Sequence, residues 1–241
     1  MHDLTQRQIE ILKTLIEEYI ETAEPVGSET LEKKHSLSAS PATIRNEMVR
    51  LTDLGYLKKT HVSSGRVPTP QAMKFYVNQL MKEKELSVAE EVALKEKVWD
   101  WRDKENDFLR ELTRSLAEKT KTLAVATTDE GDFFFSGYAN ILDMPEFYDI
   151  DFTKNLLDAI DKCEMFSLFF DKATEEEIQV LMGEDLAPSL KGPYSFVYRK
   201  YKTPHHKGEI GVIGPTRLNY TYVIPTVRYF GSLIEEISRG W

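Results

Sequence analysis

The N-terminal part of the chain repeats a helical pattern of apolar positions. Between Thr5 and Thr22 the apolar side chains recur at spacings of three and four, which predicts an amphipathic helix with one buried face. The positions expected on this face are Ile9, Leu12, Ile16, Tyr19 and Ile20. Pro25 and Gly27 interrupt the pattern, and a shorter second helix is expected from Ser28 to about Lys34.

A third helix is predicted from Ser40 onward, with a sharp division between apolar and polar positions. Ser40 can cap this helix, and Pro41 suits its first turn. Ile44, Met48 and Leu51 recur at i, i+4 and i+7, so they form a stripe that must be buried. Gly55 stands just past the last apolar turn, where the C-terminal cap of a helix belongs.

The polar face of the third helix carries side chains suited to reading DNA. Arg can pair with guanine edges, Asn with adenine edges, and Thr with a thymine methyl or a phosphate. We therefore expect base contacts from Thr43, Arg45, Asn46 and Arg50. An ordinary amphipathic surface helix is the alternative, and this helix alone does not decide between the two.

A basic hairpin is predicted after Gly55. Residues 56–61 have the pattern of a strand, residues 63–65 have turn chemistry, and Arg66 and Val67 return before a proline. Three helices and such a hairpin indicate a winged helix-turn-helix, whose third helix enters the major groove while the wing contacts the backbone. The residues expected at the DNA backbone are Ser28, Lys33, Lys34, Ser40, Lys58, Lys59, His61 and Arg66.

The placement of charge favours DNA binding, although the whole chain carries a formal net charge of −9. Residues 3–32 hold two basic and eight acidic side chains, whereas residues 33–74 hold eight basic and two acidic ones. Positive charge is therefore concentrated on the third helix and the hairpin. Binding should release counterions and weaken as salt is added.

The charged run at residues 82–85 marks the expected end of a DNA-binding domain, residues 1–82. Helical sequence follows in a connector, residues 83–121, with an interruption near Trp101. This connector either packs on its own domain or forms a dimer interface, which a reader of inverted repeats requires. The residues expected at that interface are Trp99, Trp101, Phe108, Leu112 and Phe134.

From residue 122 the pattern changes to short strands, which predicts a third region, residues 122–241. Strands are expected at 122–127, 133–137, 166–170, 194–198 and 208–214, and helices at 152–162 and 220–237. This order predicts an α+β fold with a mainly antiparallel sheet. Because successive strand side chains alternate, Phe134 should face outward if Phe133 and Phe135 enter the core. Either a partner or the closing helix would then cover it.

The same region offers little chemistry. Cys163 is the only cysteine, which excludes an internal disulfide, and His205 and His206 have no third metal ligand at a suitable spacing. No phosphate-binding loop and no nucleophile elbow occurs. We therefore expect no enzyme, no metal and no cofactor. The N-terminus has no signal-peptide pattern and no stretch approaches about 20 apolar residues, so a cytoplasmic location without a membrane is expected.

Two groups of motifs in this chain resemble the HrcA family, the heat-inducible repressors of bacterial chaperone operons. The first group comprises Pro25–Ser28, Ser40–Met48, Leu54–Leu57 and Ser64–Thr69. The second comprises Gly137–Phe147 and Ile210–Arg217, followed by Tyr220, Val223, Ile224 and Pro225. The resemblance implies a GAF-like second domain, a homodimer, binding to the inverted-repeat element CIRCE, and dependence on the GroE chaperonin.

The expected function is therefore a homodimeric repressor of heat-shock genes. A metabolite-sensing winged-helix regulator with a ligand-binding GAF-like domain is the alternative. Two departures from the family matter. Members usually carry Arg where this chain has Glu29, which leaves one phosphate contact in doubt, and Ala126–Asp132 runs directly into Phe133 where longer members insert a dimerising domain.

Overall fold

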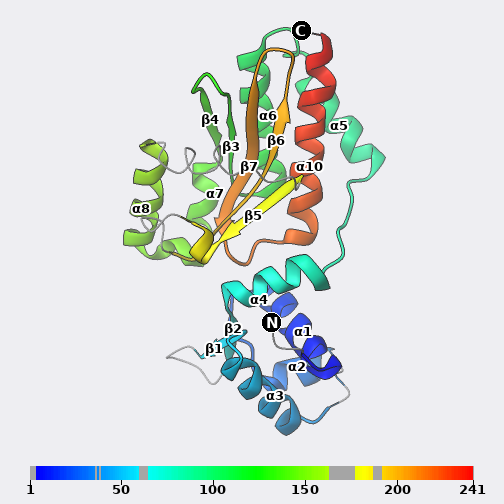
Figure 1. Cartoon of the computed structure of the whole chain (residues 1–241), viewed down its shortest axis with the longest axis vertical. Helices are drawn as coiled ribbons and strands as arrows, with labels where there is room; N and C mark the ends of the chain where they lie inside the picture. The colour runs from blue at the N-terminus through cyan, green and yellow to red at the C-terminus, as the bar shows by residue number, and fades with distance from the viewer. Residues whose placement is uncertain are drawn as a thin grey trace. The chain divides into compact units, whose positions relative to one another are not determined.

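The computed structural model describes residues 4–35, 37, 39–59, 65–162, 177–186 and 192–240. The chain divides into two compact units, Met1–Lys82 and Glu83–Trp241, and each is described by itself (Figure 1). Both units combine helices with antiparallel strands, so the α+β class is confirmed. No helix in the described part of the chain is long and apolar enough to cross a membrane.

The described residues of the first unit form three helices, a two-stranded sheet and a further helix. Its elements are α1 (Gln6–Thr22), α2 (Ser28–His35), α3 (Pro41–Asp53), β1 (Leu57–Lys59), β2 (Arg66–Pro68), α4 (Pro70–Phe75) and the π-helical turn η1 (Tyr76–Leu80). The buried face of α1 is rotated from the expected one. Ile11 and Leu15 are buried beside Leu12 and Ile16, whereas the expected Ile9, Tyr19 and Ile20 are only half-buried.

Helix α3 begins and ends where its local sequence predicts. The Ser40 side chain accepts a hydrogen bond from the backbone N–H of Thr43 at 3.2 Å, and Ile44, Met48 and Leu51 are buried. Gly55 follows the helix with φ of 82°, a left-handed conformation that glycine adopts without steric cost. The backbone oxygen of Gly55 then accepts a hydrogen bond from the Thr69 hydroxyl at 2.7 Å. The motifs 54–57 and 64–69 therefore meet in space.

Only part of the hairpin expected after α3 lies within the described residues. Strand β1 pairs antiparallel with β2 from Leu57 to Lys59, and the expected continuation to His61 lies outside the described residues. The loop before α2 adds a bridge to this sheet, because Val26 and Arg66 exchange two backbone hydrogen bonds of 2.9 Å. The sheet is therefore joined to the start of α2.

The described part of the second unit forms a five-stranded antiparallel sheet with helices on both faces. Its helical elements are α5 (Val88–Trp99), α6 (Glu105–Thr120), α7 (Tyr138–Leu142), η2 (Pro145–Tyr148), α8 (Ile150–Asp161), η3 (Gly183–Asp185), α10 (Tyr220–Ile237) and η5 (Ser238–Gly240). Its strands are β3 (Leu123–Thr127), β4 (Phe133–Ser136), β5 (Ile178–Met182), β6 (Tyr194–Lys202) and β7 (Lys207–Pro215), in the order β4-β3-β7-β6-β5.

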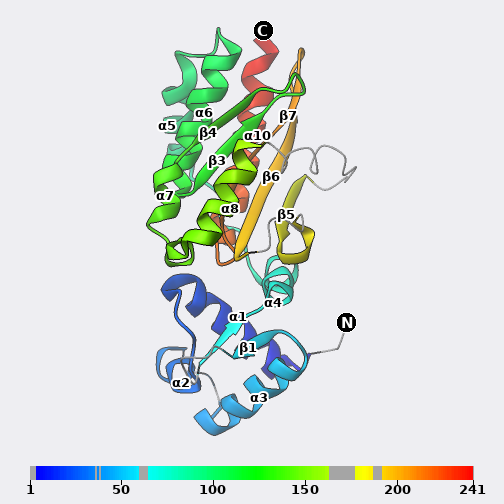
Figure 2. The same cartoon turned by 90° about the vertical axis from the view of Figure 1, so that its left-hand side faces the viewer.

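The main core of this unit lies on the side of the sheet that α7 and α8 cover. Figures 1 and 2 show α8 on one side of the sheet and α10 on the other. Leu123, Phe196 and Ile213 from the sheet join Leu156 and Ile160 from α8 in one buried cluster. Helices α6 and α10 pack on the opposite face of the sheet. The expected strand 166–170 and Cys163 lie outside the described residues.

Three residues expected at a dimer surface belong instead to this unit's interior, so that prediction is wrong for them. Phe108 and Leu112 on α6 are fully buried, and Phe134 on β4 is only 7% exposed. The predicted alternation along β4 is correct, since Phe133 and Phe135 pack on the main core. Phe134 is nevertheless covered, because α6 lies along β3 and β4 and places the Arg110 guanidinium 5.9 Å from its ring.

Polar side chains of the two distant motifs of the second unit make contacts inside the unit, and one pair joins the two motifs. Asn140 donates a side-chain hydrogen bond to the Thr122 backbone oxygen at 2.9 Å. Arg217 contacts both carboxylate oxygens of Glu146, at 2.5 and 3.1 Å. Both side chains of this pair are largely buried. The two motifs therefore include side chains that are held by packing inside the unit.

Candidate nucleic-acid interface

Helix α3 presents a continuous exposed face. Because Ile44, Met48 and Leu51 turn inward, the exposed side chains are those of Ala42, Arg45, Asn46, Val49, Arg50 and Asp53. Asn46 and Val49 lie near the middle of this face, and Arg45 and Arg50 lie on opposite flanks. The expected base reader Thr43 is only half-exposed, and its hydroxyl lies 3.0 Å from that of Ser40.

The flank that carries Arg50 is organised by a buried acid. Arg50 Nη1 lies 3.1 Å from Glu47 Oε1, and the Gln8 side-chain amide donates to Glu47 Oε2 at 3.0 Å. Glu47 is buried between α3 and α1, whereas the Arg50 side chain remains 66% exposed. The ion pair with Glu47 holds one nitrogen of the Arg50 guanidinium in place. Most of the Arg50 side chain still faces solvent.

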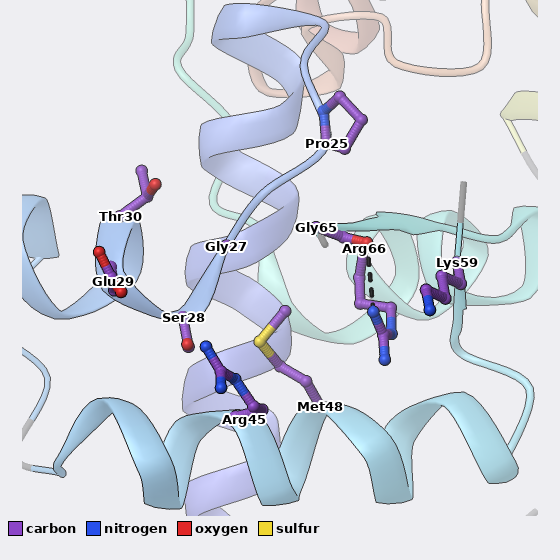
Figure 3. Close-up of a pocket in the computed structure, with 10 residues that line it drawn as sticks. All are labelled: Pro25, Gly27, Ser28, Glu29, Thr30, Arg45, Met48, Lys59, Gly65 and Arg66. Atoms are coloured by element: carbon purple, nitrogen blue, oxygen red, sulfur yellow. Dashed lines mark hydrogen bonds between the residues drawn. The ribbon is translucent and has the colours of Figure 1, made fainter. Parts of the chain in front are cut away.

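The flank that carries Arg45 borders an open groove of about 580 Å³. Figure 3 shows the residues that line it, which come from the start of α2, from α3 and from the hairpin. They are Pro25, Gly27, Ser28, Glu29, Thr30, Arg45, Met48, Lys59, Gly65 and Arg66. The groove therefore brings together Ser28, Arg45, Lys59 and Arg66, which are four of the residues that the sequence indicated for DNA binding.

The start of α2 presents hydrogen-bond donors to this groove. The first hydrogen bond of the helix runs from the Leu31 N–H to the Gly27 oxygen, at 3.2 Å. Within the described residues, the backbone N–H groups of Ser28, Glu29 and Thr30 therefore have no acceptor. Ser28 is only 5% exposed. None of the described residues forms a hydrogen bond with its hydroxyl. In Figure 3 this hydroxyl points toward Arg45.

The hairpin is seated against α2 and α3 by close backbone contacts. A Cβ atom at Gly65 would lie 2.7 Å from the Pro25 oxygen, so only glycine permits this approach. Arg66 contacts Thr52 near the end of α3, with Nε 3.3 Å from the hydroxyl oxygen. The placement of Lys59 and Arg66 beside α2 thus follows from the two motifs that carry Pro25 and Gly65.

The remaining residues expected at the DNA backbone fall into different environments. Lys34 donates to the buried carboxylate of Glu18 at 2.6 Å, and His35 lies 3.0 Å from the same carboxylate. The hydrogen bond from Lys34 lowers the pKa of Glu18 and raises that of Lys34. Lys33, Ser40 and Lys58 are exposed, and His61 lies outside the described residues.

The second unit contains ionisable groups but no metal site that the described residues reveal. No group of three or more His, Cys, Asp or Glu in that part of the chain could hold a metal ion. Glu209 is 4% exposed, and burial raises its pKa to about 7.

Trp99 and Trp101, two of the residues expected at a dimer interface, are 44% and 45% exposed. Trp99 borders a small cavity of about 300 Å³ beside Arg102 and Glu236.

Comparisons with known proteins agree with the motifs. The family described as HrcA protein C terminal domain matches residues 40–224. The heat-inducible transcription repressor HrcA of Acetivibrio thermocellus is 40% identical over 127 residues, which are 53% of this chain and 36% of that protein. The aligned part thus spans little more than a third of that relative's length.

One solved structure shares the fold. It is described as a crystal structure of a hypothetical protein, and it matches with a TM-score of 0.73 and 16% identity over 98% of both chains. At that identity the likeness concerns the fold alone. Because the family match extends from α3 to α10 and covers most of the sequence, the chain belongs to the HrcA family.

Proposed function

We propose that this chain is a DNA-binding transcriptional repressor of heat-shock genes, which acts as a homodimer on an inverted-repeat operator of the CIRCE type. The observation that carries the proposal is the exposed face of α3 beside a groove that contains Arg45, Lys59 and Arg66. In a repressor of this kind, the bound protein blocks transcription of the genes that the operator controls. Family membership and the name of the Acetivibrio thermocellus relative support the assignment to heat shock.

The first unit acts as a winged helix-turn-helix in this proposal. Helix α3 enters the major groove, and Asn46, in the middle of its exposed face, pairs with an adenine edge. Thr43 and Arg50 contact bases from the flank next to Glu47. The β1–β2 hairpin is the wing, and Lys58 and Lys59 on its exposed strand contact the backbone.

The second unit acts as a GAF-like dimerisation domain. Its antiparallel sheet between two helical layers supports a GAF-like assignment. Two copies are needed because one recognition helix covers one half-site of an inverted repeat. Trp99 and Trp101 are the residues we assign to the interface between the copies, since both are nearly half exposed. Dependence of the active repressor on the GroE chaperonin belongs to the same proposal.

Selection from random duplexes followed by footprinting tests this function. The full chain should enrich an inverted repeat and should protect both of its half-sites. Asn46→Ala should remove about 1–3 kcal/mol from binding to the selected site and little from binding to random DNA. Lys154→Gln, an exposed change in α8, is the control and should leave both affinities unchanged. Failure of the full chain to prefer any sequence would contradict the proposal.

A further inference from the structure

We propose that the groove between α2, α3 and the hairpin binds one phosphate group of the DNA backbone, and that Arg45 contacts this phosphate instead of a base edge. The inference rests on the proposed function and adds to it a defined subsite. It also divides the exposed face of α3 into a base-reading part around Asn46 and a backbone-binding flank at Arg45.

The first argument concerns hydrogen bonds. The groove contains three backbone N–H groups at the start of α2 and the hydroxyl of Ser28, all without acceptors among the described residues. Because the groove is open, water can reach these donors in the free protein, and a ligand that accepts hydrogen bonds can take the place of that water. Phosphate oxygens only accept hydrogen bonds, and a helix N-terminus favours negative charge. A phosphate oxygen can therefore accept hydrogen bonds from these donors.

The second argument concerns charge. Arg45, Lys59 and Arg66 come from three different elements and line the same groove (Figure 3). Arg45 lies beside Ser28 at the start of α2, and Arg66 and Lys59 lie farther along the groove, so an anion there meets positive charge from all three elements. The groove is open and far larger than one phosphate, so the sugar-phosphate chain can continue on both sides of the bound group.

Glu29 is the one acid among the residues that line the groove, and its position explains why it does not prevent anion binding. Its side chain is 68% exposed and lies 3.9 Å from Lys33 on the following turn. It still lowers the local positive potential. Glu29→Gln should therefore strengthen binding to every DNA sequence, most visibly at low salt.

The test compares variants of the full chain on the selected operator and on a random duplex, each over a series of salt concentrations. Arg45→Gln should weaken binding to both duplexes by a similar factor, about tenfold, and should reduce the salt slope by about one. Ser28→Ala should weaken binding to both duplexes by about fivefold, because it removes one neutral hydrogen bond. It should leave the salt slope unchanged, because it removes no charge. Lys154→Gln removes a charge from the second unit and should change neither quantity.

Duplexes that carry single neutral methylphosphonate groups then locate the phosphate. Scanning the operator with the unmodified chain should reveal one position in each half-site where neutralisation weakens binding strongly. Arg45→Gln should be almost insensitive at that position and should keep the wild-type response elsewhere. Thermal unfolding of each variant identifies any loss of affinity that arises from misfolding.

The outcomes separate this inference from the proposed function. If Arg45→Gln loses affinity for the operator alone and keeps its sensitivity at every phosphate, Arg45 reads a base and the phosphate subsite is wrong. If the unmodified chain prefers no sequence, the repressor assignment fails. Unequal effects of Arg45→Gln and Lys154→Gln on the random duplex would in that case still support the subsite, and equal effects would refute it.

Discussion

Gly65 shows how one residue without a side chain determines the position of the β1–β2 hairpin. Its φ is not in the left-handed region, so glycine is required here by space alone. The space is limited because the Pro25 backbone lies where a Cβ atom would stand, while Val26 and Arg66 form their backbone bridge next to it. Gly65 and Arg66 of one motif therefore pack directly against Pro25 and Val26 of the other.

Gly65→Ala should lower the stability of the first unit by about 1–3 kcal/mol, since an added methyl group must displace backbone. Urea unfolding monitored by circular dichroism measures the change. Gly240→Ala is the matched control, because nothing lies within 4 Å of its added Cβ. DNA affinity should fall together with stability for Gly65→Ala, since Arg66 moves with the hairpin. Equal behaviour of the two variants would contradict this account.

Glu209 is a buried carboxylate whose charge opposes folding. It lies on β7, and the Thr127 hydroxyl donates to its Oε2 at 3.0 Å. Burial raises its pKa to about 7, although Thr127 and Lys200 act in the opposite direction. The folded state therefore binds a proton more tightly than the unfolded state does. Its contribution to stability is fully present below the unfolded pKa near 4.5 and is lost as the pH rises to about 7.

Glu209→Gln should remove this pH dependence, because glutamine keeps an acceptor for Thr127 and carries no charge. The difference in unfolding free energy between the variant and the parent should grow between pH 4.5 and 7, to a value on the order of 3 kcal/mol. Thermal unfolding of both proteins across this range measures it. A difference that is constant with pH would show that Glu209 does not titrate there.

At the level of elements, local signals were predicted well and packing partners were not. Helix α3 and helix α10 have the expected limits. Caps, prolines and periodic apolar stripes depend only on residues close together in the sequence, so the sequence alone can identify them. Phe108 and Leu112 were recognised as apolar helix positions but assigned to the wrong surface. Periodicity identifies which side of a helix is apolar, and it does not identify what covers that side.

Short elements were missed for a related reason. Helix α7 has five residues, too few to show a period, and it begins where Gly137 takes a φ of 89°. Strand β5 (Ile178–Met182) is nearly all apolar and so lacks the alternation of a half-exposed strand. The groove was missed as well. Its residues were identified one by one, but the meeting of α2 with the hairpin depends on contacts between residues far apart in the sequence.

The ion pair of Glu146 and Arg217 provides a test of how elements are joined. It connects η2 to the loop between β7 and α10, and both side chains are largely buried, at 13% and 16% exposure. Glu146→Gln leaves the guanidinium without its counter-charge and should cost about 3 kcal/mol of stability. Urea unfolding measures that cost. In a double-mutant cycle, Arg217→Met should be much less harmful beside Glu146→Met than alone, and additive losses would contradict the coupling.

At the scale of the whole molecule, charge is divided between the two units. Residues 1–82 carry 11 basic and 10 acidic side chains, and residues 83–241 carry 20 and 30. The second unit therefore repels DNA in net terms. Attraction in the proposed complex must come from the cluster between Lys33 and Lys74, whose effect is local at physiological salt because charges are screened beyond roughly 8 Å. This division suits a molecule in which one unit binds DNA and the other assembles.

Assembly is the property of the whole molecule that most needs a test, because two of the five expected interface residues remain at the surface. Trp99 is stacked beneath the Arg102 guanidinium, 4.7 Å from its ring, and Trp101 follows two residues later in the break between α5 and α6. Both rings are nearly half exposed. Since large aromatic side chains are enriched at the centres of interfaces, we expect this break to lie in the contact between two copies.

Trp101→Asp should raise the dissociation constant of the proposed homodimer by at least about tenfold, which corresponds to about 1.4 kcal/mol. Sedimentation velocity over a dilution series measures the shift. The melting temperature of the dissociated protein should change little, since the ring is already nearly half in solvent. Tyr148→Asp is the control, because Tyr148 is 70% exposed and lies on η2, on the other side of the sheet from α6. If Tyr148→Asp dissociates the dimer and Trp101→Asp does not, the interface lies on the α7–α8 side, and half-site spacing must then be explained from that surface.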